Sequence, residues 1–172
     1  MIKKSYLIFL ILTINWVFSQ NTNGFDVARK GTLSDMKILV DNDKNSVNAI
    51  DDRGSSMLIL ACYRGNKEVA QFLIDNKADL NYVSPNGTAL MACVVKNELD
   101  FAEKLLKKGA NPDLTDGNGM TALMLAVQFK NAAMVKLLLS FKAKKELKCQ
   151  QNKTAFEYAV FSNNEEIINL LK

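Results

Sequence analysis

The chain has 172 residues, carries 22 lysines and arginines against 18 aspartates and glutamates, and contains no histidine. Its lysines are spread along the chain, which excludes the clustered basic stripe that proteins use to bind nucleic acid. The lack of histidine removes the commonest general base and metal ligand, and no glycine-rich phosphate loop occurs, so we expect no enzyme, metal site or cofactor.

The first nineteen residues predict a secretory signal peptide that is cleaved near Ser19 and Gln20. A short basic start precedes residues 6–18, which are almost wholly apolar. The alternative, a retained membrane anchor, needs about 20 apolar residues, and no cysteine follows the cleavage point to take a lipid. We therefore expect residues 1–19 to be removed, which leaves a mature chain without a stable membrane anchor in the periplasm or outside the cell.

From about residue 23 onward the sequence repeats at a nearly fixed interval. A hydroxyl residue opens a short apolar phrase four times, in steps of 32, 33 and 33 residues, at Ser56, Thr88, Thr121 and Thr154. Apolar residues at helical spacing follow each phrase. A period of this length predicts stacked helical hairpins, since a single hairpin cannot bury its own apolar face. Each hydroxyl can cap the helix that it opens, which is worth about 1 kcal/mol.

Turn signals separate the units. Gly109 suits a helix end that needs a left-handed residue, and Pro112 cannot continue a helix. One period before Ser56, a fainter unit begins near Asn23, with apolar residues in the matching places. This first unit lacks the opening turn, as expected of a repeat that ends an array.

These recurring signals resemble the ankyrin repeat, which has a finger turn, an inner helix opened by Thr-Pro-Leu-His and a longer outer helix. The resemblance covers residues 23–172 and implies an all-α solenoid of about five repeats, the first degenerate. The family's proline is replaced by alanine or methionine, and its histidine by Ile59, Met91, Met124 or Glu157, so we expect weaker finger turns in the same fold. The expected units within residues 20–172 are about 20–50, 51–83, 84–115, 116–148 and 149–172.

Stacking of the repeats predicts one continuous buried row along the inner helices, formed by Leu58, Leu90, Leu123 and Phe156. Cys62 and Cys93 should face the packed side of neighbouring inner helices. A helix-packing distance of about 8–10 Å would hold their backbones apart, which is too far for a disulfide. Cys149 falls in a finger turn, where we expect it to be exposed. It could pair there with another chain or remain an incidental thiol.

The resemblance implies a protein-binding module whose concave face combines the finger turns with the exposed side of the inner helices. Tyrosine and arginine are over-represented among binding hot spots, and two of the cations at these positions would favour an acidic patch on the partner. The alternative is that the aromatic rings pack on the neighbouring repeat. Mapping by period gives the candidate partner-binding residues Arg53, Ser55, Tyr63, Arg64, Asn86, Val95, Lys96, Asn118, Met120, Gln128, Phe129, Gln151 and Phe161.

The expected function is therefore non-catalytic binding of another protein, by a monomer that uses no cofactor, metal or nucleic acid. The alternative is an exported effector that acts on a protein of a foreign or host cell. Two pairs of neighbouring acids have structural explanations. Asp51 and Asp52 open a turn, and Glu165 and Glu166 lie near a helix start, where negative charge suits the helix dipole.

Overall fold

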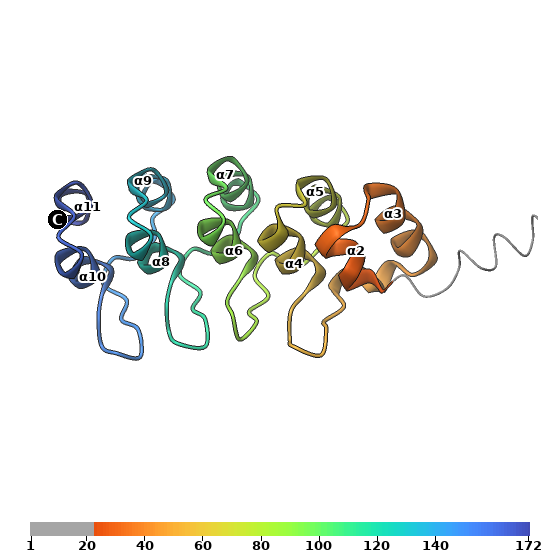
Figure 1. Cartoon of the computed structure of the whole chain (residues 1–172), viewed down its shortest axis with the longest axis horizontal. Helices are drawn as coiled ribbons and strands as arrows, with labels where there is room; N and C mark the ends of the chain where they lie inside the picture. Colours follow the sequence, from red (N-terminus) through yellow and green to blue (C-terminus); the bar gives the residue numbers. More distant parts are fainter. Residues whose placement is uncertain (1–22) are drawn as a thin grey trace, which may run out of the picture.

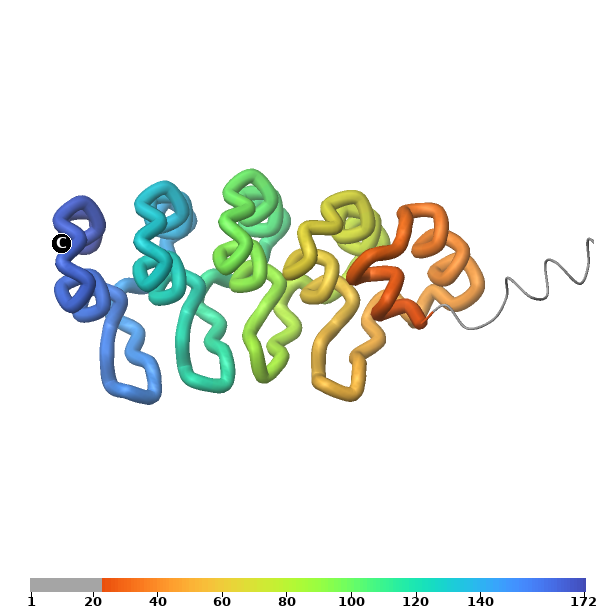
Figure 2. The backbone as a smooth tube through the Cα atoms, in the orientation of Figure 1, coloured from red at the N-terminus to blue at the C-terminus, as the bar shows by residue number. Residues whose placement is uncertain are grey.

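The computed structural model describes residues 23–172 (Figures 1 and 2). The expected signal peptide over residues 1–19 lies outside the described residues. Across residues 23–172 the chain is helical, with no β-strand beyond isolated bridges. The elements are α2 (Gly24–Lys30), α3 (Leu33–Asn42), a 3₁₀ helix (Lys44–Asn48), α4 (Met57–Arg64), α5 (Lys67–Asp75), α6 (Ala89–Val95), α7 (Leu99–Lys107), α8 (Ala122–Gln128), α9 (Ala132–Ser140), α10 (Ala155–Phe161) and α11 (Glu165–Leu171).

The helices form two parallel rows, as the repeat period predicted. The inner helices α4, α6, α8 and α10 stand side by side, and the outer helices α5, α7, α9 and α11 make the second row (Figure 1). Finger loops project from the inner row, on the side away from the outer helices (Figure 2). Helix α2 packs on α4 and thereby extends the inner row by one repeat. The expectation of an all-α solenoid is confirmed.

The predicted helix caps are present in all four full repeats. The side-chain oxygen of Ser56, Thr88, Thr121 or Thr154 accepts a hydrogen bond from the backbone N–H three residues later, at 3.2–3.3 Å. Gly109 has φ of 99°, so the predicted left-handed helix end is confirmed. The N–H groups at a helix start have no partner within the helix, and these caps explain why each inner helix begins where it does.

Acidic side chains brace two of the fingers in place of the missing histidines. A carboxylate oxygen of Asp51 accepts hydrogen bonds from the backbone N–H groups of Arg53 and Ser55, at 3.1 and 2.8 Å. Asp116 accepts from those of Asn118 and Met120 in the same way, at 2.8 and 2.9 Å. The prediction that Asp51 opens a turn is therefore confirmed, and Glu165 and Glu166 lie in the first turn of α11 as expected.

The core runs through the whole array, with two corrections to the sequence expectations. Leu58, Leu90 and Leu123 are buried as predicted, but Phe156 is 37% exposed because the described chain has no further repeat to cover α10. Cys149 is buried rather than exposed, and its Sγ lies 3.3 Å from the hydroxyl oxygen of Tyr158. The finger folds back on α10, which removes the accessible thiol that pairing with another chain would need.

Candidate functional site

Hydrogen bonds join the fingers of the four full repeats into a continuous surface. The hydroxyl of Tyr82 donates to the carbonyl oxygen of Gly54 at 3.0 Å, across the first pair of fingers. The Gly117 N–H donates to the carbonyl oxygen of Pro85 at 3.0 Å, across the second pair. A Cβ atom at position 117 would lie only 2.9 Å from that oxygen, so this close approach requires glycine. The fingers are thus held in fixed register.

The last pair of fingers is bonded twice. The backbone N–H of Gln150 donates to the carbonyl oxygen of Asn118 at 3.0 Å, and its side-chain amide donates to that of Gly117 at 2.7 Å. Every junction between neighbouring full repeats therefore carries a hydrogen bond at its finger. Loops that are already held in register reduce the ordering cost of binding a partner.

Large apolar side chains stay exposed where the inner helices end. They are Tyr63 and Val95 on α4 and α6, Phe129 just after α8, and Phe161 at the end of α10. Phe161 is 84% exposed, so packing on the neighbouring repeat does not explain why a large aromatic ring occupies this position. Exposed apolar residues that recur along one edge of a protein mark an interaction surface more often than isolated ones do.

A surface hollow of about 390 Å³ lies between the ends of α6 and α8. Val95 and Phe129 supply apolar lining, and Lys130 and Asn131 supply polar groups. The side-chain amide of Asn131 donates to Asn97 Oδ1 at 2.6 Å, while its own oxygen caps α9 by accepting from the Met134 N–H at 3.0 Å. The hollow thus combines fixed polar groups with apolar side chains, as binding sites for side chains do.

Sequence reasoning missed Lys130 and Asn97, although a signal for them existed. They lie nine residues after the capping hydroxyl of their repeats, and this position has positive φ in all four full repeats, at Gly65, Asn97, Lys130 and Asn163. Glycine and asparagine are the residues that adopt this conformation most readily. Their recurrence would have placed a tight turn at the rim of the surface.

A lysine of the last finger also belongs to this surface. Lys153 Nζ lies 5.4 Å from the ring centroid of Phe161 and 5.8 Å from that of Tyr158, within the range of cation–π attraction. The hydroxyl of Tyr158 also donates to the side-chain oxygen of Gln151 at 3.4 Å. Finger and inner helix therefore meet on one surface in this repeat, as the resemblance implied.

Two of the predicted partner-binding residues do not lie on this surface. Ser55 and Met120 are buried, because their N–H groups close the finger turns on Asp51 and Asp116 and their side chains turn inward. The remaining candidates are exposed, and their part in binding stays a prediction. They are Arg53, Tyr63, Arg64, Asn86, Val95, Lys96, Asn118, Gln128, Phe129, Gln151 and Phe161.

Positive charge prevails among the exposed ionisable side chains of this face. Arg53, Arg64, Lys96, Lys130 and Lys153 belong to it and take part in none of the ion pairs formed within residues 23–172. Of the acids there, Glu157 is tied to the cap of α10, where the N–H and hydroxyl of Thr154 lower its pKa. Complementary charge on a partner would favour its approach to this face.

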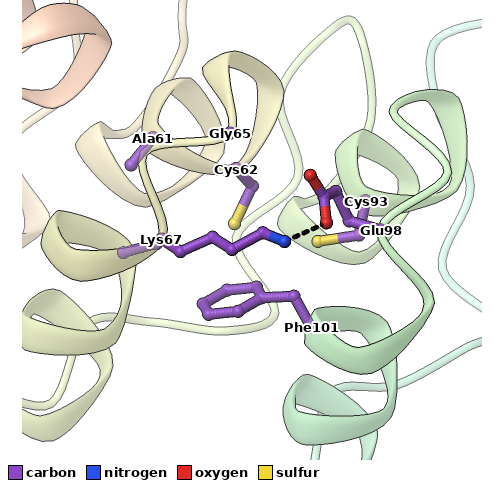
Figure 3. A pocket seen from close by; sticks show the side chains of 8 residues that line it. Ala61, Cys62, Gly65, Lys67, Cys93, Glu98 and Phe101 are labelled. Carbon is purple, nitrogen blue, oxygen red and sulfur yellow. Dashed lines mark ion pairs between the residues drawn. The ribbon is translucent and has the colours of Figure 1, made fainter.

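A small cavity lies inside the array, between the second and third repeats (Figure 3). Its volume is about 10 Å³, and the ammonium of Lys67 pairs with Glu98 across it at 2.5 Å. Glu98 raises the pKa of Lys67. The part of the chain that the structure describes has no cluster of three or more potential metal ligands. No helix among the described residues has both the length and the apolar character to cross a membrane.

Comparison with known proteins places these features in a family. The family model for ankyrin repeats (3 copies) matches residues 25–116 and 105–172. An ankyrin repeat-containing protein of Treponema pallidum is 32% identical over 123 residues, which cover 70% of this chain and 41% of the relative.

Relatives from animals are also similar to this chain, over smaller fractions of their own length. Ankyrin repeat and SAM domain-containing protein 6 of Rattus norvegicus is 32% identical over 120 residues, which cover 67% of this chain and 14% of the relative. Inversin of Danio rerio is 42% identical over 86 residues, which cover 49% of this chain and 8% of the relative. This chain therefore spans less than half the length of each of these relatives.

Proposed function

We propose that this chain, which belongs to the ankyrin-repeat family, binds a partner protein on the face formed by its finger turns and the ends of its inner helices. Ankyrin repeats are interaction modules, generally without catalysis. The observation that carries the proposal is the row of exposed apolar side chains at Tyr63, Val95, Phe129 and Phe161, in an array whose other inner-helix positions are mostly buried. Binding is rigid-body docking onto a preformed surface.

The partner that fits this face has an acidic patch beside an apolar one. Five cations lie on the face, among them Arg64, which follows Tyr63 in the chain, and Lys96, which follows Val95. Charge of one sign around an apolar strip steers a partner of the opposite sign and discriminates against others. The protein acts as a monomer and uses no cofactor in this proposal.

We further propose that binding takes place in the periplasm or outside the cell. The basic and apolar pattern of residues 1–19 supports this location, because it has the layout of a secretory signal. Cell fractionation with N-terminal sequencing tests it. A mature protein that begins near Gln20 in the periplasm or the medium is expected, and an uncleaved protein in the cytoplasm would contradict it.

The binding face is tested by affinity capture from envelope extract, followed by mass spectrometry. The variant Tyr63→Ala with Arg64→Glu removes one ring and reverses one charge on the face. Its matched control is Ile38→Ala with Lys37→Glu, a neighbouring pair of the same kinds of residue exposed on the outer helix α3. Circular dichroism confirms that both variants are folded.

We expect a partner that the parent and the control retain and the face variant loses. A partner retained by both variants would place binding elsewhere on the array. A partner found only in extract of another organism would favour the alternative of an exported effector.

A further inference from the structure

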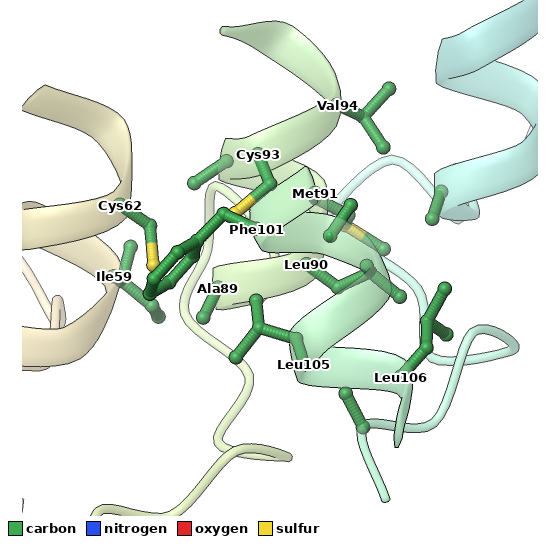
Figure 4. Packing of buried hydrophobic residues seen from close by; sticks show 14 of the residues in the cluster. Ile59, Cys62, Ala89, Leu90, Met91, Cys93, Val94, Phe101, Leu105 and Leu106 are labelled. Carbon is green, nitrogen blue, oxygen red and sulfur yellow. The ribbon is translucent and has the colours of Figure 1, made fainter. Parts of the chain in front are cut away.

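Two cysteines from neighbouring repeats point into the same internal cavity. Cys62 lies on α4 and Cys93 on α6, and both line the cavity of about 10 Å³ between these helices (Figure 3). Both are buried, and both are free thiols. Figure 4 shows their side chains together beside the ring of Phe101. The binding face does not use these groups, because they lie behind it in the core.

The surroundings of the thiols give them room to move toward one another. Ala61 and Ala70 contribute only methyl groups to the lining, and Gly65 contributes no side chain. The cavity is about the smallest that could hold one water molecule, so a shift of a sulfur atom can be absorbed there without displacing a neighbour. Towards solvent, the cavity is bounded by Lys67 and Glu98, which are partly exposed.

The helix spacing expected from the sequence does not decide whether the two thiols can form a disulfide. A helix-packing distance of about 8–10 Å would keep two cysteines apart, but Cα atoms of α4 and α6 come within 8 Å of one another. Disulfides usually join Cα atoms about 4.4–6.8 Å apart. Both side chains line the same cavity between α4 and α6, so a bond forms if these helices approach until the Cα atoms of Cys62 and Cys93 reach this range.

We propose that Cys62 and Cys93 form an oxidisable pair, which closes a disulfide between the second and third repeats by exchange with a small disulfide such as oxidised glutathione. One cysteine thiolate attacks a sulfur of the donor, which gives a mixed disulfide and releases one glutathione thiolate. The second cysteine thiolate then displaces the remaining glutathione. Two protein thiols are oxidised and one donor disulfide is reduced, and the two cysteine protons end on the two released glutathiones.

The bond would act directly on the spacing of the candidate binding face. Tyr63 and Arg64 follow Cys62 in the chain, and Val95 and Lys96 come shortly after Cys93. Joining the two cysteines therefore clamps the part of the face that the second and third repeats share. This inference does not depend on the identity of a partner, nor on whether that face binds one.

Exchange through this pair should quicken as the pH rises. The neighbouring thiol of Cys93 and burial both raise the pKa of Cys62 well above its ordinary value. The charged groups that line the cavity are Lys67 and Glu98, which pair with one another. Because the thiolate is the attacking species, little of it is present at neutral pH and more appears as the pH rises.

The test uses protein expressed from the full-length sequence and incubated with oxidised glutathione at neutral and raised pH. Intact mass and peptide mapping then locate any bond. The controls are Cys62→Val and Cys93→Ala. Valine occupies the position of Cys62 in the next two repeats, at Val94 and Val127, and alanine occupies the position of Cys93 at Ala61 and Ala126. Both variants should therefore fold.

We expect the parent to lose two hydrogen atoms, to give a peptide that links Cys62 to Cys93, and to recover under dithiothreitol. The oxidised form should melt higher by roughly 5–15 °C, since a disulfide restricts the unfolded chain. Each variant should form no internal bond. Both thiols remaining free, in native buffer and in urea just below the unfolding transition, would overturn the proposal. A lasting glutathione adduct, a link to Cys149 or a lower Tm on oxidation would also overturn it.

Discussion

The fourth repeat, built on α8, and the last repeat, built on α10, have the same local structure and different burial. Leu123 and Val127 are fully buried on α8. Their equivalents one period later, Phe156 and Val160, are 37% and 51% exposed on α10. The helices have the same length and the same threonine cap. The difference comes from the neighbour, since α8 is covered on both sides and α10 is covered by the described chain on one.

This comparison shows that burial in the array is a property of the interface between repeats. The sequence of the last repeat is compatible with the open face that α10 has among residues 23–172. Glu157 stands where Met91 and Met124 stand in earlier repeats, and its carboxylate accepts a hydrogen bond from the N–H of Thr154 at 2.6 Å. A polar residue at this position costs nothing on an open face and would be unfavourable in a buried one.

The largest effect should come from removing a side chain at a covered position. Leu123→Ala leaves a cavity between three inner helices and should cost about 2–5 kcal/mol of unfolding free energy. Phe156→Ala removes a larger side chain but should cost less, because much of that ring already meets solvent. Urea unfolding, monitored by circular dichroism, measures the unfolding free energy of both variants.

An equal or larger loss for Phe156→Ala would contradict the comparison between the two repeats. It would mean that the open face of α10 is covered in solution. Sedimentation analysis of the parent would then show whether a second copy of the chain covers it.

A second, smaller effect concerns acid. The backbone N–H and the hydroxyl of Thr154 lower the pKa of Glu157 below its ordinary value of 4.5. Asp35 has a lowered pKa for the same reason, beside Thr32 in the first repeat. The interior caps have Ile59, Met91 or Met124 at the matching position, and these residues do not titrate.

The lowered pKa gives the sign of the pH dependence. A carboxyl that binds protons less readily in the folded state stabilises it above the unfolded pKa and loses this contribution as the pH falls through the folded pKa. We therefore expect Glu157→Gln to be less stable than the parent at pH 7 and equal to it at about pH 2, where Glu157 is protonated. The control Glu165→Gln should show a smaller difference at pH 7. A difference that persists at low pH would assign the effect to packing.

The period of the sequence predicted most of this fold, because it repeats chemical constraints that act within one unit. The caps at Thr88 and Thr121 and the buried row through Leu123 follow from such constraints. Exposure of Phe156 could not be predicted in this way, since a position within a repeat does not say what covers it.

The candidate site was less predictable, because exposure in a finger depends on which way each side chain turns. Ser55 and Met120 occupy finger positions like those of Arg53 and Asn118, but the bonds that close the turn direct them inward. The facing thiols of Cys62 and Cys93 come from different positions in adjacent repeats. Only the packing of two helices brings such residues together, and this proximity cannot be predicted from a regular spacing in the sequence.

The smallest effect should come from the polar contact between the last two outer helices. Lys136 on α9 pairs with Glu166 on α11 at 2.8 Å, and both side chains are more than half exposed. Water screens such a pair, so Lys136→Met should change the unfolding free energy by less than about 0.5 kcal/mol. The control Lys37→Met removes an exposed lysine from α3, outside the ion pairs found within residues 23–172. A loss several times larger for Lys136→Met than for the control would show that the last repeat is held partly by charge. Since Ile167 and Leu171 are buried against the rest of the array, we expect apolar contact to hold it instead.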